Sequence, residues 1–341
     1  MINIHTISEF LLQAGTDYRI FDMGRGIRKL SNQVFLDLES AITAAPCPRQ
    51  QHAWFGVIFF NKQLNSEHFI WFVKLPLDEQ GLLMAAARDH FLQIIVDALG
   101  QQLENQTKTN GQLPENPYSF LPTQQQLADF NSTSRLDFNL GQSQHYAAAL
   151  AYFEHPEQQS WQLLSLQGIA DFAALVKQKK TRDLLIASLP QLAPQVYAPL
   201  CASLENHPIP LDLSQCINDW VMDDLKDVTR VQSGLRALSQ STAKTMVQAL
   251  ILNVLKSKHS LNGDVLILLA ARHWQHMCDE LVLESYINNL AQLDDDMFIG
   301  LYSDLVQIPI LREKMLGVLR WPQKSKALSG AIGKLFSGQA K

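Results

Sequence analysis

The residues with the clearest potential for chemistry form a basic, glycine-containing turn near the N-terminus. Residues 23–29 (MGRGIRK) follow an apolar stretch and carry three cations. The backbone amides of such a turn, together with Arg25, Arg28 and Lys29, are suited to binding phosphate or another anion. A dinucleotide fingerprint needs a third glycine and a surrounding parallel βαβ unit, and the sequence indicates neither. The turn is therefore a candidate anion site, and its alternative interpretation is a solvated basic turn.

A second cluster lies near residue 275. His273 and His276 stand three residues apart, with a thiol and carboxylates next to them at residues 278–280. Histidines at this spacing on a helix share a face and are weak candidates for metal ligands. A zinc site needs three or four converging ligands, whereas a histidine near a helix C-terminus also interacts favourably with the helix dipole. We predict no metal here and expect both side chains to be exposed at a helix end.

Signatures of nucleophilic catalysis are missing from the sequence. It contains no Gly-x-Ser-x-Gly turn, and its four cysteines form no Cys-x-x-Cys pair or catalytic-cysteine signature. We predict no cofactor and no enzymatic activity. The densest basic run, residues 177–182, has no interleaved aromatic residues, and the chain has a formal net charge of −5. Nucleic acid is therefore not an expected partner.

The elements that position these residues differ along the chain. Aromatic and β-branched runs over residues 54–60 and 68–73 predict a β-hairpin, and residues 18–23 predict a further strand. Apolar positions over residues 78–99 recur at helical spacing and predict a long helix. We expect these elements to form a small α+β domain over residues 1–100.

The remaining sequence predicts a linker followed by helices only. Residues 101–122 are rich in Gln, Asn, Thr, Gly and Pro, and they carry too little apolar surface to offset the entropy of ordering. Residues 123–341 predict a HEAT-like array of antiparallel helix pairs, with a compact helical bundle as the alternative. Helices are expected near residues 123–137, 143–154, 160–178, 181–190, 194–205, 213–222, 225–238, 242–257, 264–275, 279–291, 296–306, 310–320 and 323–336. The side chains expected to lie buried between layers are Val247, Leu250, Ile251, Val254, Leu266, Leu269 and Ala270.

Composition limits the class of protein. The chain of 341 residues is 47% hydrophobic and 18% charged, which is enough apolar surface to bury sizeable cores. The first residues lack the basic and apolar regions of a secretory signal, and no apolar run is long enough to span a bilayer. Together with the scattered cysteines, this predicts a cytoplasmic protein with no membrane partner.

Several stretches resemble a known family. They are residues 8–25 (SEFLLQAGTDYRIFDMGR), 161–174 (WQLLSLQGIADFAA), 189–211 (LPQLAPQVYAPLCASLENHPIPL) and 219–227 (DWVMDDLKD). On these residues the chain resembles a proteobacterial family of unknown function, and the likeness covers nearly the whole length. The resemblance implies one architecture for the chain and no particular activity.

These observations favour a binding protein over an enzyme. Helical arrays present long surfaces that hold other macromolecules, so we expect a protein-protein interaction scaffold or adaptor whose partner is another protein. The α+β module then serves as a second binding surface or forms a homodimer. The alternative function is a small-molecule or nucleotide-binding enzyme with its site between the two domains.

Overall fold

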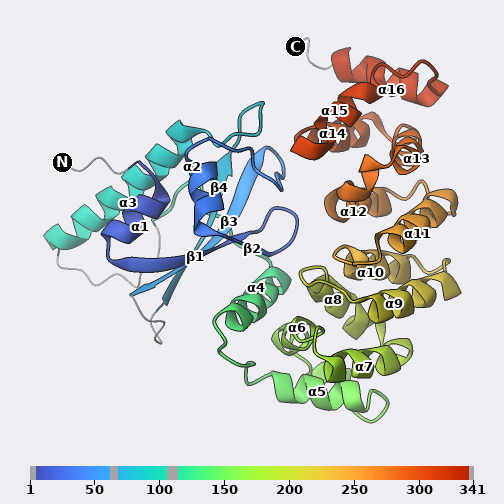
Figure 1. Ribbon diagram of the computed structural model, residues 1–341, viewed down its shortest axis with the longest axis horizontal. Coiled ribbons are helices and arrows are strands. Elements are labelled where there is room, and N and C mark those ends of the chain that lie inside the picture. Colours follow the sequence, from blue (N-terminus) through green and yellow to red (C-terminus); the bar gives the residue numbers. More distant parts are fainter. Residues whose placement is uncertain (1–4, 62–67, 106–113, 338–341) are drawn as a thin grey trace. The chain divides into compact units, whose positions relative to one another are not determined.

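The computed structural model describes residues 5–61, 68–105 and 114–337, with side chains placed outside residues 99–105 (Figure 1). The chain forms two compact units, one comprising residues up to Pro122 and the other nearly all of residues 123–341. Among the described residues, no helix combines the length and the apolar character needed to cross a bilayer.

The first unit packs three helices against an antiparallel sheet. Its elements in chain order are α1 (Ile7–Gln13), β1 (Thr16–Asp22), β2 (Arg28–Leu30), α2 (Asn32–Glu39), β3 (His52–Asn61), β4 (His68–Pro76) and α3 (Ala85–Asn105). The strand order is β2-β1-β3-β4, and Val57 of β3 lies opposite both Ile20 of β1 and Trp71 of β4. Alternate strand residues face the helices and form one core with them, for example Phe55 and Val73 with Phe35 and Phe91.

Local sequence explains where these elements begin and end. Thr6 caps α1 in a reciprocal capping box with Glu9, and Gly15, with φ of +75°, lets the chain leave the helix and enter β1. Both strands of the predicted hairpin are present. The predicted helix over residues 78–99 instead begins at Ala85, because the Asp78 carboxylate accepts hydrogen bonds from the amides of Gln80 and Leu82 and holds a turn.

The segment predicted as a linker contains ordered structure at both of its ends. Helix α3 continues to Asn105. On the far side, the Lys74 amide donates to the Tyr118 carbonyl at 2.7 Å and the Phe120 amide donates to the Phe72 carbonyl at 3.1 Å. Residues 118–120 thus lie hydrogen-bonded along the edge of β4.

The second unit is helical throughout its described residues. Its helices are α4 (Gln124–Asp137), α5 (Tyr146–Glu154), α6 (Leu166–Ala174), α7 (Lys179–Ser188), α8 (Pro194–Leu204), α9 (Leu211–Asp223), α10 (Val228–Leu238), α11 (Lys244–Lys256), α12 (Gly263–Arg272), α13 (Glu280–Leu290), α14 (Asp295–Val306), α15 (Pro309–Val318) and α16 (Lys326–Ser337). Three short 3₁₀ helices accompany them: η1 (Trp161–Leu163), η2 (Leu189–Gln191) and η3 (Trp274–Cys278).

Helices two places apart in the sequence pack together in this unit. The even-numbered helices form one continuous series of contacts from α4 to α16, and the odd-numbered helices form another from α5 to α13. The unit is therefore a two-layered array, and Figure 1 shows its helices following one another along the stack. The residues expected between layers, including Leu250 of α11 and Leu269 of α12, are at most 1% exposed, which confirms that prediction. The predicted helix over residues 160–178 is wrong in its first part, because Leu164 and Ser165 are extended and Ser165 caps α6.

Candidate functional site

The basic turn near the N-terminus is built around a buried carboxylate. Asp22 ends β1 and accepts a hydrogen bond from the Gly24 amide at 3.0 Å. Burial raises the pKa of Asp22 to about 7, and the nearby Arg28 and Arg25 oppose that increase. Arg25 is itself buried, and its Nε donates to the Pro48 carbonyl at 2.7 Å. This arginine therefore organises the turn from within the fold.

The three cations of the candidate anion site do not converge. Arg28 and Lys29 are neighbours on β2, so their side chains point to opposite faces of the sheet. Gly24 is needed for close packing, because a Cβ at this position would lie 2.1 Å from the Cys47 carbonyl oxygen. The glycine and the buried arginine thus have structural explanations, and Lys29 is the one exposed cation of the three.

His273 follows the last residue of α12, and His276 lies in η3. The expectation that both side chains are exposed is wrong for His273. This side chain is 1% exposed, and its Nε2 lies 2.7 Å from the Leu235 carbonyl oxygen. Because a carbonyl only accepts, Nε2 carries the proton. Burial, together with neighbouring His276, lowers the pKa of His273 to about 3. Among the described residues, no three His, Cys, Asp or Glu side chains gather as metal ligands.

The basic run at residues 177–182 takes part in local ion pairs. Arg182 Nε donates to Asp212 Oδ2 at 2.7 Å and so links α7 to α9. Lys179 forms an ion pair with Asp183 one turn along α7, again at 2.7 Å. The run therefore belongs to a helix junction.

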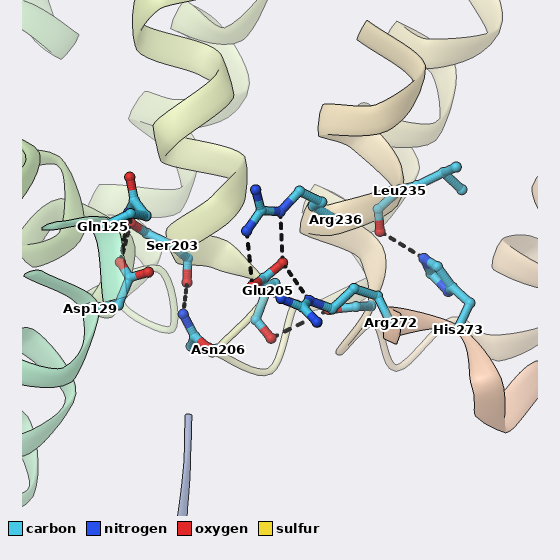
Figure 2. Close-up of polar contacts among 10 residues, drawn as sticks. Gln125, Asp129, Ser203, Glu205, Asn206, Leu235, Arg236, Arg272 and His273 are labelled. Atoms are coloured by element: carbon cyan, nitrogen blue, oxygen red, sulfur yellow. Dashed lines mark hydrogen bonds and ion pairs between the residues drawn. The ribbon is translucent and has the colours of Figure 1, made fainter. Parts of the chain in front are cut away.

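One buried polar network of the array was not predicted from the sequence. It is centred on Glu205, which follows α8 and is 6% exposed (Figure 2). Arg236 of α10 donates to both carboxylate oxygens, from Nε at 2.8 Å and from Nη2 at 3.1 Å. Arg272 of α12 donates from Nη2 at 2.9 Å, and its Nε lies 2.9 Å from the other oxygen. One carboxylate thus joins three successive helices of the even-numbered layer.

A second buried carboxylate lies close by but has different partners. Asp129 of α4 accepts hydrogen bonds from Ser203 Oγ at 2.5 Å and from Gln125 Nε2 at 3.0 Å (Figure 2). Burial, with a smaller contribution from the charge of Glu205, raises the pKa of Asp129 to about 7, against the opposing effect of the hydrogen bonds from Ser203 and Gln125. Burial would also raise the pKa of Glu205, but the arginines at 272 and 236 outweigh it and lower that pKa.

Two carboxyl groups with opposite pKa shifts are the components of an acid-base pair. Here each group is already engaged: both oxygens of Glu205 face arginines, and Asp129 Oδ1 accepts from Ser203 and Gln125. We conclude that the network holds α4, α8, α10 and α12 in register. The sequence does contain a signal for this network. Glu205 lies 31 residues before Arg236 and 67 before Arg272, and these separations are close to one and two lengths of a helix-pair repeat.

The outer side chains of the odd-numbered layer show a regular charge pattern. Helix α7 carries three cations and one carboxylate, α9 carries only carboxylates, α11 only lysines and α13 only glutamates. The sign of the net charge therefore changes from each helix to the next. Exposed apolar side chains lie on α9, α13 and α15. They are Leu211 (64% exposed) and Met222 (39%) on α9, Leu281 (64%) on α13, and Ile310 (57%) and Leu316 (44%) on α15.

Comparison with known proteins places the chain in a family. A family model described as "protein of unknown function (DUF3549)" matches residues 2–336. The chain belongs to this family. No curated protein and no solved structure matches the chain. DUF3549 membership confirms the family resemblance of the sequence, and the description of the family names no activity.

Proposed function

We propose that the protein is a non-catalytic scaffold that binds another protein on the odd-numbered layer of a HEAT-like helical array. The observation that carries this proposal is the composition of that layer, where exposed apolar side chains lie among charges whose sign alternates between helices. Protein-binding surfaces combine apolar anchors with a polar rim. Stacked helix pairs are well suited to display such a surface over several repeats.

The charged groups inside the fold have structural partners, which supports a binding function over a catalytic one. Glu205 forms ion pairs with Arg236 and Arg272 within the even-numbered layer. The candidate anion site places its cations on different faces, and Arg25 is occupied by the Pro48 carbonyl. The charges that remain at the surface of the odd-numbered layer are arranged for contact with a large partner, and we expect that contact to occur in the cytoplasm.

A charge-reversal scan of the odd-numbered layer tests the proposal. Each variant of the full chain would reverse one exposed charge: Lys180→Glu, Asp219→Lys, Lys256→Glu, Glu284→Lys or Lys314→Glu. Thermal unfolding followed by circular dichroism would report stability, and affinity purification from native extract with mass spectrometry would report the partner. We expect stability to change by less than about 1 kcal/mol in each variant, because the positions are exposed. A connected subset should lose the partner.

The matched control is Lys226→Glu, since Lys226 is exposed in the loop between α9 and α10 and lies outside the layer. It should retain both fold and partner. If no reversal in the layer changes what co-purifies, the scaffold proposal is wrong. If, in addition, Lys29→Glu abolishes retention of a small anionic molecule, the ligand-binding alternative replaces it.

A further inference from the structure

A groove opens between α13 and α15 near the C-terminal end of the array. It encloses about 410 Å³ and is lined by Glu280, Leu283 and Glu284 on one side and by Lys314, Gly317 and Trp321 on the other, with Pro322 and Gln323 at one end. The groove therefore has apolar surface from Leu283, Trp321 and Pro322 between an acidic wall and a basic one. A volume of this size holds one or two large side chains of a partner.

The groove coincides with a break in the packing of the odd-numbered layer. Contacts join α5 to α7, α7 to α9, α9 to α11 and α11 to α13. Within the part of the chain that the structure describes, α13 and α15 do not form a closely packed pair of this kind. Helix α13 packs more closely against α16 than against α15, so the opening between α13 and α15 is bordered by helices against which a further helix can pack.

The charged side chains of the two walls form no ion pairs with other described residues. Glu280 and Glu284 are exposed and lie one turn apart on α13, where like charges repel. Neither Glu280 nor Glu284 pairs with a described cation, and Lys314 does not pair with a described carboxylate. A partner with cations facing α13 and a carboxylate facing α15 would neutralise both walls.

Resting on the proposed scaffold function, we propose that this groove binds an amphipathic helix of a partner protein. The helix has an apolar anchor over Gly317 beside Trp321, Lys or Arg on the flank facing Glu280 and Glu284, and Asp or Glu on the flank facing Lys314. This is the helix-in-groove mode, in which apolar residues spaced by three and four positions enter the groove and charged flanks set the orientation. The partner is thus defined by its charge polarity as well as by its apolar stripe.

Gly317 provides a selective way to close the groove. A Cβ at this position would meet no heavy atom within 4 Å, and the residue lies in the last turn of α15 without a positive φ. Glycine loses more backbone entropy on folding than a residue with a side chain does. A larger residue should therefore leave the fold intact, or stabilise it, while its side chain occupies the space of the partner's anchor.

The test is a selection with a displayed library of 16-residue amphipathic helices that carry a constant apolar stripe and random charged flanks. The full-length chain would be the bait, and Gly317→Leu the counter-bait. We expect enriched sequences to be basic on one flank and acidic on the other, and to bind Gly317→Leu at least about tenfold more weakly in fluorescence anisotropy, a loss of about 1.4 kcal/mol. Exchanging the two flanks of an enriched peptide should weaken its binding, and Glu280→Lys with Glu284→Lys should reverse that preference.

Gly300→Leu is the control, because Gly300 of α14 also has no heavy atom within 4 Å of its added Cβ and does not line the groove. It should bind the peptides as the parent does. The groove proposal is overturned if no sequence prefers the parent to Gly317→Leu, or if exchanged flanks bind equally well. The scaffold proposal is judged separately, since a partner lost in the charge-reversal scan at α7 or α9 would uphold it even if this groove binds nothing.

Discussion

Glu39 in the α+β unit and Glu205 in the helical array are both buried acids, but they meet different partners. Glu39 accepts hydrogen bonds from the Ile7 amide at 2.5 Å and from the Ser8 amide and hydroxyl at 3.2 and 2.5 Å, at the start of α1. Burial raises the pKa of Glu39 to about 7, against the opposing effect of those bonds and of Arg88. Two guanidinium groups hold the pKa of Glu205 below its usual value.

The difference reflects what each unit must join. The α+β unit uses a carboxyl group as a cap for the orphan amides of a neighbouring helix, so neutral donors suffice. The array must hold successive helices of one layer at a fixed spacing, and a carboxylate between two arginine forks sets both distance and orientation. A buried carboxyl group is thus a local cap in one region and a connection across repeats in the other.

The largest expected loss of stability concerns the apolar core between the two layers of the array. Leu250→Asp puts a charge among side chains that are at most 1% exposed, and we expect it to lower the free energy of unfolding by about 3–5 kcal/mol. Urea denaturation followed by circular dichroism measures this loss. Lys256→Asp on the same helix is the control and should change stability by less than about 1 kcal/mol. A loss below 1 kcal/mol for Leu250→Asp would mean that α11 does not lie between packed layers.

The next effect separates the two glutamates directly. Glu205→Gln removes the buried carboxylate that pairs with two half-buried arginines and leaves both without a counter-charge, so we expect it to cost roughly 3 kcal/mol at pH 7. Glu39→Gln keeps one acceptor oxygen, for Ser8 or for Ile7, and its NH2 group then faces the other donor, but no cation loses its counter-charge. We therefore expect a smaller loss of about 1–2 kcal/mol. Urea denaturation measures the free energy of unfolding of both variants. Equal losses would mean that Glu39 and Glu205 do not play different structural roles.

A smaller effect follows from Asp129, whose raised pKa makes the folded state bind more protons than the unfolded state between about pH 4 and 7. Stability linked to this group is present at low pH and is lost as pH rises through the folded pKa. Asp129→Asn removes this linkage and keeps an acceptor for Ser203 and Gln125. On lowering the pH from 8 to 5, the parent should gain roughly 1–3 kcal/mol relative to the variant. Parallel stability curves against pH would show that the group titrates normally.

The smallest predicted effect distinguishes the two histidines. His273→Ala leaves the Leu235 carbonyl without its donor, and we expect a loss of about 1–2 kcal/mol. His276→Ala affects a partly exposed side chain and should cost less than about 1 kcal/mol. Elemental analysis of the parent should detect no stoichiometric zinc, whereas one zinc per chain that disappears in both variants would make the pair a metal site.

Local patterns were sufficient to predict much of the fold. The aromatic runs at β3 and β4 predict the hairpin, and the apolar stripe through Val247, Leu250 and Val254 predicts the buried face of α11. The start of α3 was misplaced because an acidic residue before an apolar stripe serves equally well as a helix cap or as a turn residue. Asp78 adopts the second role.

The buried polar network could not be derived in this way, because its members meet only through stacking. Glu205 and Arg272 are 67 residues apart, and each alone resembles a charged residue at a helix end. His273 was expected at the surface for the same reason, whereas its acceptor is a backbone carbonyl on α10, 38 residues earlier. Pairing between successive helices of one layer depends on the spacing of whole helices, which residue types do not encode individually.

The arginine forks at Glu205 also have a mechanical consequence. They clamp the C-terminal ends of α8, α10 and α12 to one point, while the opposite ends of these helices have no equivalent fastening through Glu205. When thermal motion or a load bends this part of the array, the C-terminal ends of the three helices should stay close together. Their N-terminal ends should move apart more. We therefore expect bending of α8, α10 and α12 relative to one another to occur mainly by changes of spacing at their N-terminal ends.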